Sequence, residues 1–523
     1  MSNRIISIVL ITAMLLWIGC TDTKQFTRQE FVANGESGEI IVLTKDNQLY
    51  RFTRQSYQIK GDSLVGRGGL RRGEQWFTFA GAIALTDVEF VQADRPNGVK
   101  TALLVGGIAA GVALMALAAA ASSMKGWGGG SGGGSGGGLG GGGKFSCPFV
   151  YTHDGTNYHI ESETFAGAVF KGLERPTFDN LYHLKPVAGE YKLQLRNAGE
   201  ETEYVNELKL ITVDHPIGTR IVPDMRGVIH TIEHPELPMM CNEFNGKDAL
   251  KYVIDDDSLY WESDLSNKDV TRESDLRDGL ILEFNKPANA KSAKIVVNGI
   301  NSHLGFFALE HLFKLKGENK LQWFQELEHN PVEKGKFINW LKREGMLHIK
   351  LWQDGQWVEQ ALMYDVGPLI AKDQIAVLDI STIRDTRLRV KLESATDLWR
   401  IDHVYVDYSA DRTVNARELA PFAAIDESGK DVAPLLISSD TIYYTTFPGQ
   451  YATLRFKEVA GTPESKRSFV LKTKGYYHQW IDAAGPDNKE MVERILTEPL
   501  YGSKVLMPKW KESKRLYGEN SRN

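Results

Sequence analysis

The chain has little cysteine and no excess of one charge sign, and both shortages narrow its function. Three cysteines in 523 residues are too few for a disulfide framework. Lysine and arginine number 61 against 67 aspartate and glutamate, which gives a formal net charge of −6. A dedicated nucleic-acid-binding protein would show a basic face, so we expect no nucleic-acid partner. With 42% hydrophobic and 24% charged residues, the composition is that of folded protein, and the length allows two to four domains.

Recognisable catalytic and metal-binding motifs are also missing from the sequence. The histidines form no HExxH motif, so we expect no metal and no cofactor. The GxSxG pattern occurs only around Ser131 and Ser135 in the glycine tract, where no strand and helix flank the serine to form a nucleophile elbow. The tight motif around Cys147 has no neighbouring positive charge to activate a thiol. We therefore assign no catalytic residue. The acidic run at residues 255–257 matches no calcium loop, and we interpret it as solvated turn residues.

Residues 1–19 have the layout of an export signal, with Arg4 followed by an apolar core. The core ends at Gly19-Cys20, and the chain then turns polar at once. This junction resembles a bacterial lipoprotein signal, which would make Cys20 the lipid attachment site. Trp17 departs from that pattern, where leucine is usual. An uncleaved anchor, or a plain signal peptide with an incidental cysteine, is the alternative interpretation.

Residues 20–99 predict a small β domain. Residues 21–34 form a polar lead without periodicity, and short β-like runs with turn residues between them follow. We expect four or five strands, with residues 61–73 as a glycine-rich turn region. The basic residues of that region could face lipid headgroups, but a solvated loop explains them better.

Residues 100–124 predict a transmembrane helix, because no charge lies between Lys100 and Lys125 over the roughly 20 residues needed to cross a bilayer. Gly107 and Gly111 form a GxxxG motif, which lets two helices pack closely and favours a homo-oligomer. A buried helix in a soluble core is the alternative. Residues 125–144 are nearly all glycine and predict a flexible linker, because they offer almost no side chains to bury.

The remaining residues predict a large antiparallel β region, so the fold class is mainly β. Alternating runs indicate a β domain at residues 145–275, with a hairpin around Asp154-Gly155. Residues 276–412 predict a β-sandwich similar to the jelly roll of galactose-binding-like domains, with two or three helices inserted at 306–344. Residues 413–523 predict further strands, a short helix near 489–496 and a basic tail from 504 to 522.

Several short blocks of the large region resemble a family of uncharacterised bacterial envelope lipoproteins. The resemblance covers residues 145–480 and rests on the following blocks: Ser146-Cys147-Pro148-Phe149-Val150-Tyr151, Lys171-Gly172-Leu173-Glu174-Arg175, His183-Leu184-Lys185-Pro186, Asp214-His215-Pro216, Trp261-Glu262-Ser263-Asp264-Leu265, Arg277-Asp278-Gly279-Leu280 and Lys474-Gly475-Tyr476-Tyr477. It implies an architecture and a location in the envelope, and no chemistry.

From these features we expect a lipid-anchored cell-envelope protein with a non-catalytic binding or scaffolding role. Its large domain would lie on the periplasmic or surface side and bind a protein or carbohydrate ligand. A carbohydrate-active or other hydrolase is one alternative, and a component of a helix-oligomerising membrane complex is another. In an oxidising compartment, Cys147 and Cys241 could form a disulfide.

Overall fold

The computed structural model describes residues 21–26, 40–44, 49–52, 56–72, 75–96, 148–481, 483 and 485–514. The fold is mainly β, as the sequence predicted: 45% of the residues lie in strands, which form several antiparallel sheets, and 20% lie in helices. The chain divides into two compact units, Met1–Ala118 and Ala119–Asn523. The predicted signal (1–19), lipid site Cys20, apolar run (100–124) and glycine linker (125–144) lie outside the described residues. No helix within the described ranges is long and apolar enough to cross a membrane.

The first unit is one antiparallel sheet in the order β1-β7-β2-β3-β5-β4, with β6 paired to β5. Its strands are β1 (Thr21–Phe26), β2 (Ile40–Thr44), β3 (Leu49–Phe52), β4 (Tyr57–Lys60), β5 (Ser63–Arg72), β6 (Gln75–Ala84) and β7 (Val88–Pro96). Its core gathers Ile40, Val42, Phe52 and Leu64, among others. Seven strands replace the four or five expected.

Two predictions for this unit are wrong. The polar lead at residues 21–34 contains β1, because Thr21–Phe26 pairs through its backbone with β7, which an apolar pattern does not reveal. The predicted turn region at 61–73 contains the ten-residue strand β5. Its glycines admit neighbouring backbone, since a Cβ on Gly68 would lie 2.1 Å from the Arg51 carbonyl oxygen. Glycine inside a strand marks such a close approach as well as a turn.

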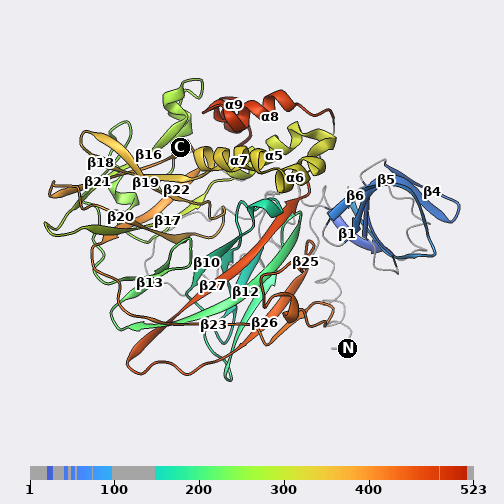
Figure 1. Ribbon diagram of the computed structural model, residues 1–523, viewed down its shortest axis with the longest axis horizontal. Coiled ribbons are helices and arrows are strands. Elements are labelled where there is room, and N and C mark those ends of the chain that lie inside the picture. The colour runs from blue at the N-terminus through green and yellow to red at the C-terminus, as the bar shows by residue number, and fades with distance from the viewer. Residues whose placement is uncertain are drawn as a thin grey trace, which may run out of the picture. The chain divides into compact units, whose positions relative to one another are not determined.

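The second unit contains four larger antiparallel sheets and the hairpin β13–β14, and Figure 1 shows their arrangement. The first sheet has the order β10-β27-β12-β23, with β25 paired to β12; the second is β24-β26-β11-β8-β9. Their strands are β8 (Phe149–His153), β9 (Tyr158–Glu163), β10 (Arg175–Leu181), β11 (Glu190–Arg196), β12 (Glu201–Pro216), β23 (Asn415–Leu419), β24 (Ala423–Asp426), β25 (Tyr444–Thr446), β26 (Tyr451–Lys457) and β27 (Ser465–Gln479).

The other two sheets follow the orders β15-β16-β21-β18-β19 and β20-β17-β22. Their strands, with those of the hairpin, are β13 (Arg220–Pro223), β14 (Ile229–Ile232), β15 (Met240–Glu243), β16 (Arg277–Asn285), β17 (Ser292–Asn301), β18 (Leu347–Gln353), β19 (Gln356–Met363), β20 (Lys372–Asp379), β21 (Arg387–Ala395) and β22 (Trp399–Asp407). The predicted hairpin at Asp354-Gly355 is confirmed. Both residues have positive φ, 48° and 81°, as a type I′ turn requires.

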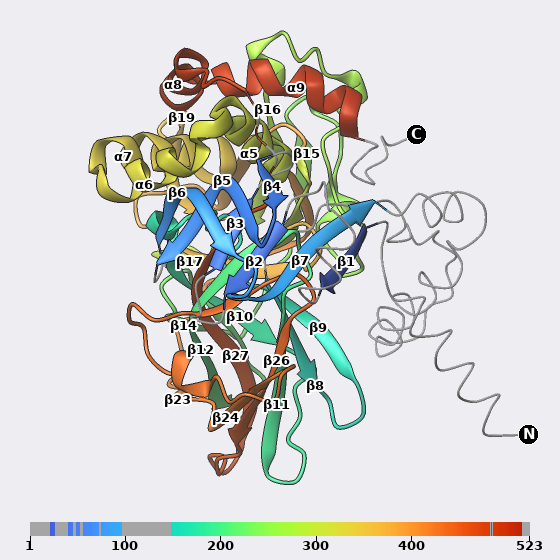
Figure 2. The same cartoon turned by 90° about the vertical axis from the view of Figure 1, so that its right-hand side faces the viewer.

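The helical insertion is confirmed as α5 (Leu304–Leu315), α6 (Lys320–His329) and α7 (Pro331–Trp340). Asn330 begins α7, where its Oδ1 accepts from the N–H groups of Val332 and Glu333, with Pro331 in the first turn. The short helix predicted near 489–496 is α8 (Lys489–Thr497). In both Figure 1 and Figure 2 these helices gather at one end of the large unit, opposite the sheet of β11 and β26.

Residues 504–513 of the predicted basic tail belong to helix α9 (Tyr501–Ser513), which the sequence did not predict, and residues 515–522 lie outside the described part of the chain. Pro508 within the segment disfavours a helix by removing a hydrogen-bond donor. Burial of Leu506, Met507 and Trp510 outweighs that cost, and those three side chains face the core.

The large unit has two main apolar cores and two smaller clusters, and α5 contributes to both main cores. The first core takes side chains from β11, β12, α6, α7 and α8, and the second from β16 to β18, β21, β22 and α9. Helix α5 contributes Leu312 and Phe313 to the first core and Leu304 and Phe307 to the second.

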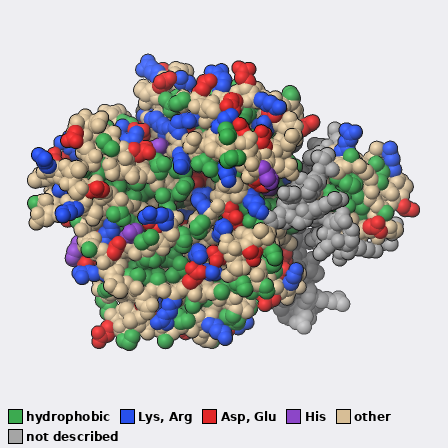
Figure 3. Space-filling view, viewed as in Figure 1, with side chains coloured by type: hydrophobic (Ala, Val, Ile, Leu, Met, Phe, Trp, Pro, Cys, Tyr) green, Lys and Arg blue, Asp and Glu red, His purple; other side chains and the backbone are tan. Residues whose placement is uncertain are grey.

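On the face shown in Figure 3, basic and acidic side chains are interspersed, with hydrophobic side chains gathered between them.

Candidate functional site

A cavity of about 270 Å³ opens where the helices meet the sheets of the large unit. Its walls come from the loop after β9, the beginning of β10, helices α5, α7 and α9, and the loop between β19 and β20. Apolar side chains make up most of its lining, among them Leu304, Leu309, Ile338, Leu341, Leu506 and Met507. A concave site with an apolar body and a few polar groups is the usual form of a small-molecule site.

Three unusual backbone conformations lie beside this cavity. Residues Leu341–Gly345 form a single π-helical turn at the end of α7, a feature often found at functional sites. Leu500, which precedes α9, has φ 60°, and Phe165, which precedes the lining residue Ala166, has φ 43°. Non-glycine residues pay an energetic cost in this left-handed region. The surrounding structure holds these positions in place around the cavity.

A glycine makes room for the polar edge of the cavity. Gly167 has φ 73°, and a Cβ there would lie 2.7 Å from Asp365 Oδ1. The Arg175 guanidinium donates to the Ala166 carbonyl at 2.7 Å, lies 3.8 Å from Asp365 Oδ1 and lies 4.5 Å from the centre of the Tyr364 ring. Burial raises the pKa of Asp365, although Arg175 lowers it. The edge of the cavity therefore carries the guanidinium of Arg175 and the carboxyl of Asp365, and the arginine offsets the cost of burying that carboxyl only in part.

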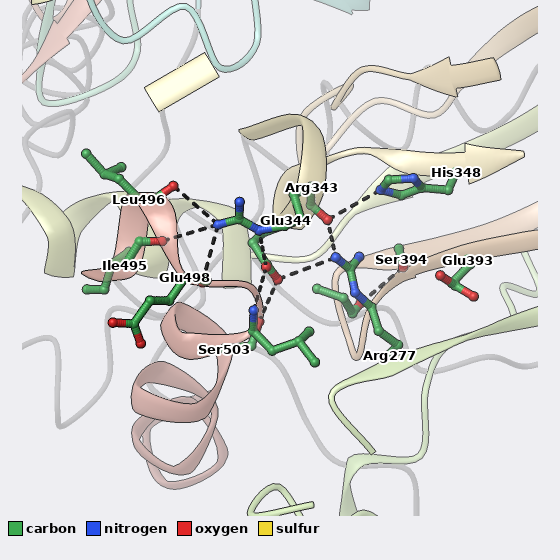
Figure 4. Close-up of polar contacts among 12 residues, drawn as sticks. Arg277, Arg343, Glu344, His348, Glu393, Ser394, Ile495, Leu496, Glu498 and Ser503 are labelled. Carbon is green, nitrogen blue, oxygen red and sulfur yellow. Dashed lines mark hydrogen bonds and ion pairs between the residues drawn. The ribbon is translucent and has the colours of Figure 1, made fainter. Parts of the chain in front are cut away.

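Figure 4 shows how the π-helical wall is fixed. Glu344 is 8% exposed. Its Oε1 accepts from Arg343 Nε at 3.0 Å and from the Leu500 N–H at 3.1 Å, and its Oε2 accepts from Ser503 Oγ at 3.0 Å. The Arg277 guanidinium lies 3.6 Å from the same carboxylate. Glu344 is thus occupied in joining the wall to α9.

The arginines of this network hold the neighbouring elements. Arg343 Nη2 points to three carbonyl oxygens at the end of α8, those of Ile495, Leu496 and Glu498, at 3.3 to 3.5 Å. The Arg343 carbonyl in turn accepts from Arg277 and lies 3.3 Å from His348 Nε2. Basic groups at a helix C-terminus satisfy carbonyls that have no partner within the helix. These contacts position the wall.

The loop between β19 and β20, which forms another wall, is held by the buried carboxyl of Glu163. Glu163 Oε2 accepts from the N–H groups of Leu369 and Ile370 at 2.8 and 2.9 Å. Its Oε1 has no hydrogen-bond partner among the described residues. Burial raises the pKa of Glu163 to about 7, although both N–H groups lower it. Lys372 donates to the Glu163 backbone carbonyl and pairs with Asp179 at 2.8 Å.

One basic side chain at the cavity has no hydrogen-bond or ion-pair partner among the described residues. Lys342 lies in the π-helical turn, lines the cavity and is exposed. Its amine forms no hydrogen bond or ion pair with any residue that the structure describes. By contrast, the carboxylate of Glu174, which also lines the cavity, binds Asn206 Nδ2 at 3.0 Å and Tyr443 Oη at 3.1 Å. Of the two cations that line the cavity, Arg175 and Lys342, it is therefore Lys342 that is available to a ligand.

The structure does not bring the predicted site residues together at this cavity. Cys241 lies on β15, fully buried with a free thiol, and burial raises its pKa to about 12. Cys20, Gly107, Gly111 and Cys147 lie outside the described residues, so lipidation, helix packing and the Cys147–Cys241 pairing stay predictions.

The cavity itself escaped sequence reasoning. Its lining comes from segments up to 341 residues apart, from Ala166 to Met507. The available signals were weak: a glycine at 167, another at 367 and the arginine at 175. Glycines in loops are common, and only the fold shows that these two accommodate carboxyl groups.

No protein-family model matches the chain, and no curated protein matches it significantly. The resemblance to envelope lipoproteins therefore stays a prediction, and the site is interpreted from its geometry alone.

Proposed function

We propose that the protein is a lipid-anchored envelope protein whose large unit binds a small amphipathic anion without transforming it. The observation that carries this proposal is the apolar cavity with the uncommitted amine of Lys342 at its edge. Its volume is near the lower end for ligand sites, which favours a short apolar chain over a polymer. The lipoprotein anchor and the sandwich arrangement of the sheets belong to this proposal as expectations from the sequence.

The carboxyl groups at the cavity favour binding over hydrolysis. A glycoside hydrolase needs two carboxyl groups free to exchange protons or attack the substrate. Glu174 and Glu344 are both engaged in hydrogen bonds that join structural elements. Asp365 remains, beside Arg175. One carboxyl group is not the pair that this chemistry requires.

A chain-length series of carboxylates tests the proposal. Binding of hexanoate, octanoate and decanoate to the detergent-solubilised protein is measured by isothermal titration calorimetry. Each buried methylene contributes about 0.8 kcal/mol, so affinity should rise about fourfold per methylene and level off when the cavity is full. Affinity that is independent of chain length would contradict burial in an apolar cavity.

Two variants locate the site. Ala308→Phe places a ring in the cavity from α5 and should reduce octanoate affinity about tenfold or more, since a full cavity excludes the chain. Lys342→Gln should weaken octanoate about two- to fivefold and leave octanol unchanged, because an exposed ion pair contributes little. Lys489→Gln, on α8 away from the cavity lining, is the matched control. Equal losses in Lys342→Gln and Lys489→Gln would place the anion elsewhere.

A further inference from the structure

A second cluster of polar side chains lies on the sheet of β20, β17 and β22. Asn298 of β17 pairs with Asp373 of β20 on one side and His403 of β22 on the other. Cross-strand neighbours share a face of the sheet, and Asn298 Nδ2 donates to Asp373 Oδ1 at 2.8 Å. The cluster is separate from the cavity, because none of these residues lines it.

A β-bulge brings an additional carboxyl to this row. The pairing passes from Asn298 with His403 directly to Gly299 with Ile401, so Asp402 has no partner opposite it on β17. Bulges redirect side chains and occur beside functional sites. Asp402 is 1% exposed, and its Oδ1 has no hydrogen-bond partner within the described ranges. Its carboxyl shares a hydrogen bond with the exposed Asp256, in the segment between β15 and β16.

Tyr405 supplies a second unpartnered buried atom. It lies two residues after His403 on the same strand face, with ring centres 5.1 Å apart. Tyr405 is 1% exposed, and its hydroxyl makes no hydrogen bond in the described part of the chain. Burial raises the pKa of that hydroxyl, and the charges of Asp373 and Asp256 raise it further, although Arg220 lowers it. A buried hydroxyl without a partner is costly unless a ligand completes it.

The cluster is short of positive charge. Arg220 donates to Asp373 Oδ2 at 3.3 Å, and the Tyr182 hydroxyl donates to the same oxygen at 3.1 Å. Asp373 is therefore satisfied, whereas Asp402 has only the Ser258 backbone N–H and the hydrogen bond that it shares with Asp256. Burial raises the pKa of Asp402 to about 7, and the charges of Asp256 and Asp257 add to that effect. The Ser258 N–H offsets this effect only in part, and none of the ion pairs among the described residues involves Asp402.

We propose that Asp256, Asp402 and Tyr405 bind the protonated amine of a small ligand. An ammonium group carries three hydrogen-bond donors and a positive charge, and so matches two carboxyl groups and a hydroxyl. A metal ion fits less well, because the described residues contain no group of three or more His, Cys, Asp or Glu side chains arranged to hold one. The amine enters from the side of Asp256, which is exposed.

The test compares a diamine with a neutral molecule of the same length. Cadaverine and 1,5-pentanediol are titrated into the full-length protein in detergent, by calorimetry at pH 8. Cadaverine should bind at least about tenfold more tightly, because hydrogen bonds to charged groups are about twice as strong as neutral ones. Equal affinity for the diol would overturn the assignment to amines.

Four variants separate this site from general surface attraction. Asp402→Asn should weaken cadaverine about tenfold or more, and Tyr405→Phe about fivefold. Arg220→Gln should tighten binding, because it removes the competing cation, and a variant that merely unfolds cannot show such a gain. Asp379→Asn is the control: it is an exposed carboxyl at the other end of β20, bonded to the Ser381 N–H.

Two results would overturn the proposal. The first is an equal loss of cadaverine binding in Asp379→Asn and Asp402→Asn, which would indicate attraction by surface charge alone. The second is wild-type affinity in both Asp402→Asn and Tyr405→Phe while circular dichroism shows both variants to be folded.

Discussion

Two buried carboxyl groups of the large unit have pKa values shifted in opposite directions. Asp214, where β12 meets β27, is 4% exposed, and Glu163, at the end of β9, is fully buried. Hydrogen bonding to Arg467 lowers the pKa of Asp214 to about 2, whereas burial raises the pKa of Glu163 to about 7. Burial alone therefore does not decide the direction of the shift.

The difference lies in the donors. Arg467 binds Asp214 through Nε at 2.7 Å and Nη2 at 2.9 Å, and Thr462 adds its N–H and its hydroxyl. Glu163 has two backbone N–H donors on one oxygen and none on the other. The nearby cation, Lys372, binds Asp179 and the Glu163 backbone instead of the Glu163 carboxyl. A bidentate arginine compensates desolvation, and two amides do not.

Removing the arginine should have the largest effect. Arg467→Met leaves the Asp214 charge buried without its cation, which costs about 3–5 kcal/mol of unfolding free energy. Urea denaturation at pH 7, followed by tryptophan fluorescence, measures the loss. Arg494→Met is the control, because its pair with Glu498 is a surface i,i+4 contact of the kind worth about 0.5 kcal/mol. Equal losses in the two variants would remove the distinction drawn for Asp214.

The pH dependence of stability should show both groups, with opposite signs. Glu163 binds a proton more tightly in the folded chain, so its contribution is fully present below pH 4.5 and is lost as pH rises to about 7. The shift from 4.5 to about 7 corresponds to roughly 3 kcal/mol. For Asp214 the stabilisation is present above pH 3.8 and is lost as pH falls towards about 2.

In Glu163→Gln, the free energy of unfolding should decline less between pH 4.5 and 7, and its decrease at acid pH, which comes from Asp214, should be unchanged. Urea midpoints measured across pH 2–8 would show both effects. A residual slope is expected in the variant, because the pKa of Asp402 is also raised to about 7. A decline as steep as that of the wild type would show that Glu163 is not the responsible group.

The surroundings of Asp214 and Glu163 also show which features the sequence can predict and which it cannot. The strands β8, β9, β12 and β18, the turn at Asp354-Gly355 and the helical insertion were all predicted, because each depends on local periodicity or turn residues. The pairing of Asp214 with Arg467 depends on the register of β12 against β27, and the two residues are 253 apart in sequence. No local pattern encodes that register.

The cavity escaped prediction for a similar reason. Phe306 and Leu309 have the helical spacing that predicts a shared face, and the sequence does not say that the surface opposite them is incompletely filled. Helix α9 was missed because its lysines and Pro508 dominate its composition, although its apolar residues, which the structure buries, lie one helical turn apart.

The tight fit around Glu163 predicts the next largest effect. A Cβ on Gly367, where φ is 93°, would lie 2.6 Å from Glu163 Oε2. Gly367→Ala should cost about 1–3 kcal/mol, from backbone strain together with this contact. Gly355→Ala provides the matched control, since φ is 81° there and no atom lies within 4 Å of the added Cβ. Urea denaturation gives the loss of unfolding free energy in each variant, and the difference between the two losses is the contribution of the contact with Glu163. Equal losses would mean that the loop between β19 and β20 shifts to relieve the contact.

Asp179 should change the Glu163 titration without touching its carboxyl, and this is the smallest expected effect. The negative charge of Asp179 raises the pKa of Glu163, while Lys372 lowers it. Asp179→Asn removes the first influence and releases Lys372 from its 2.8 Å pair. Both changes favour the ionised form of Glu163, so its pKa should fall. Carbon-13 NMR of the glutamate carboxyl groups measures the midpoint, with Asp379→Asn on the exposed end of β20 as control. An unchanged or higher midpoint in Asp179→Asn would mean that the amides of Leu369 and Ile370, rather than neighbouring charges, set the proton affinity of this wall of the cavity.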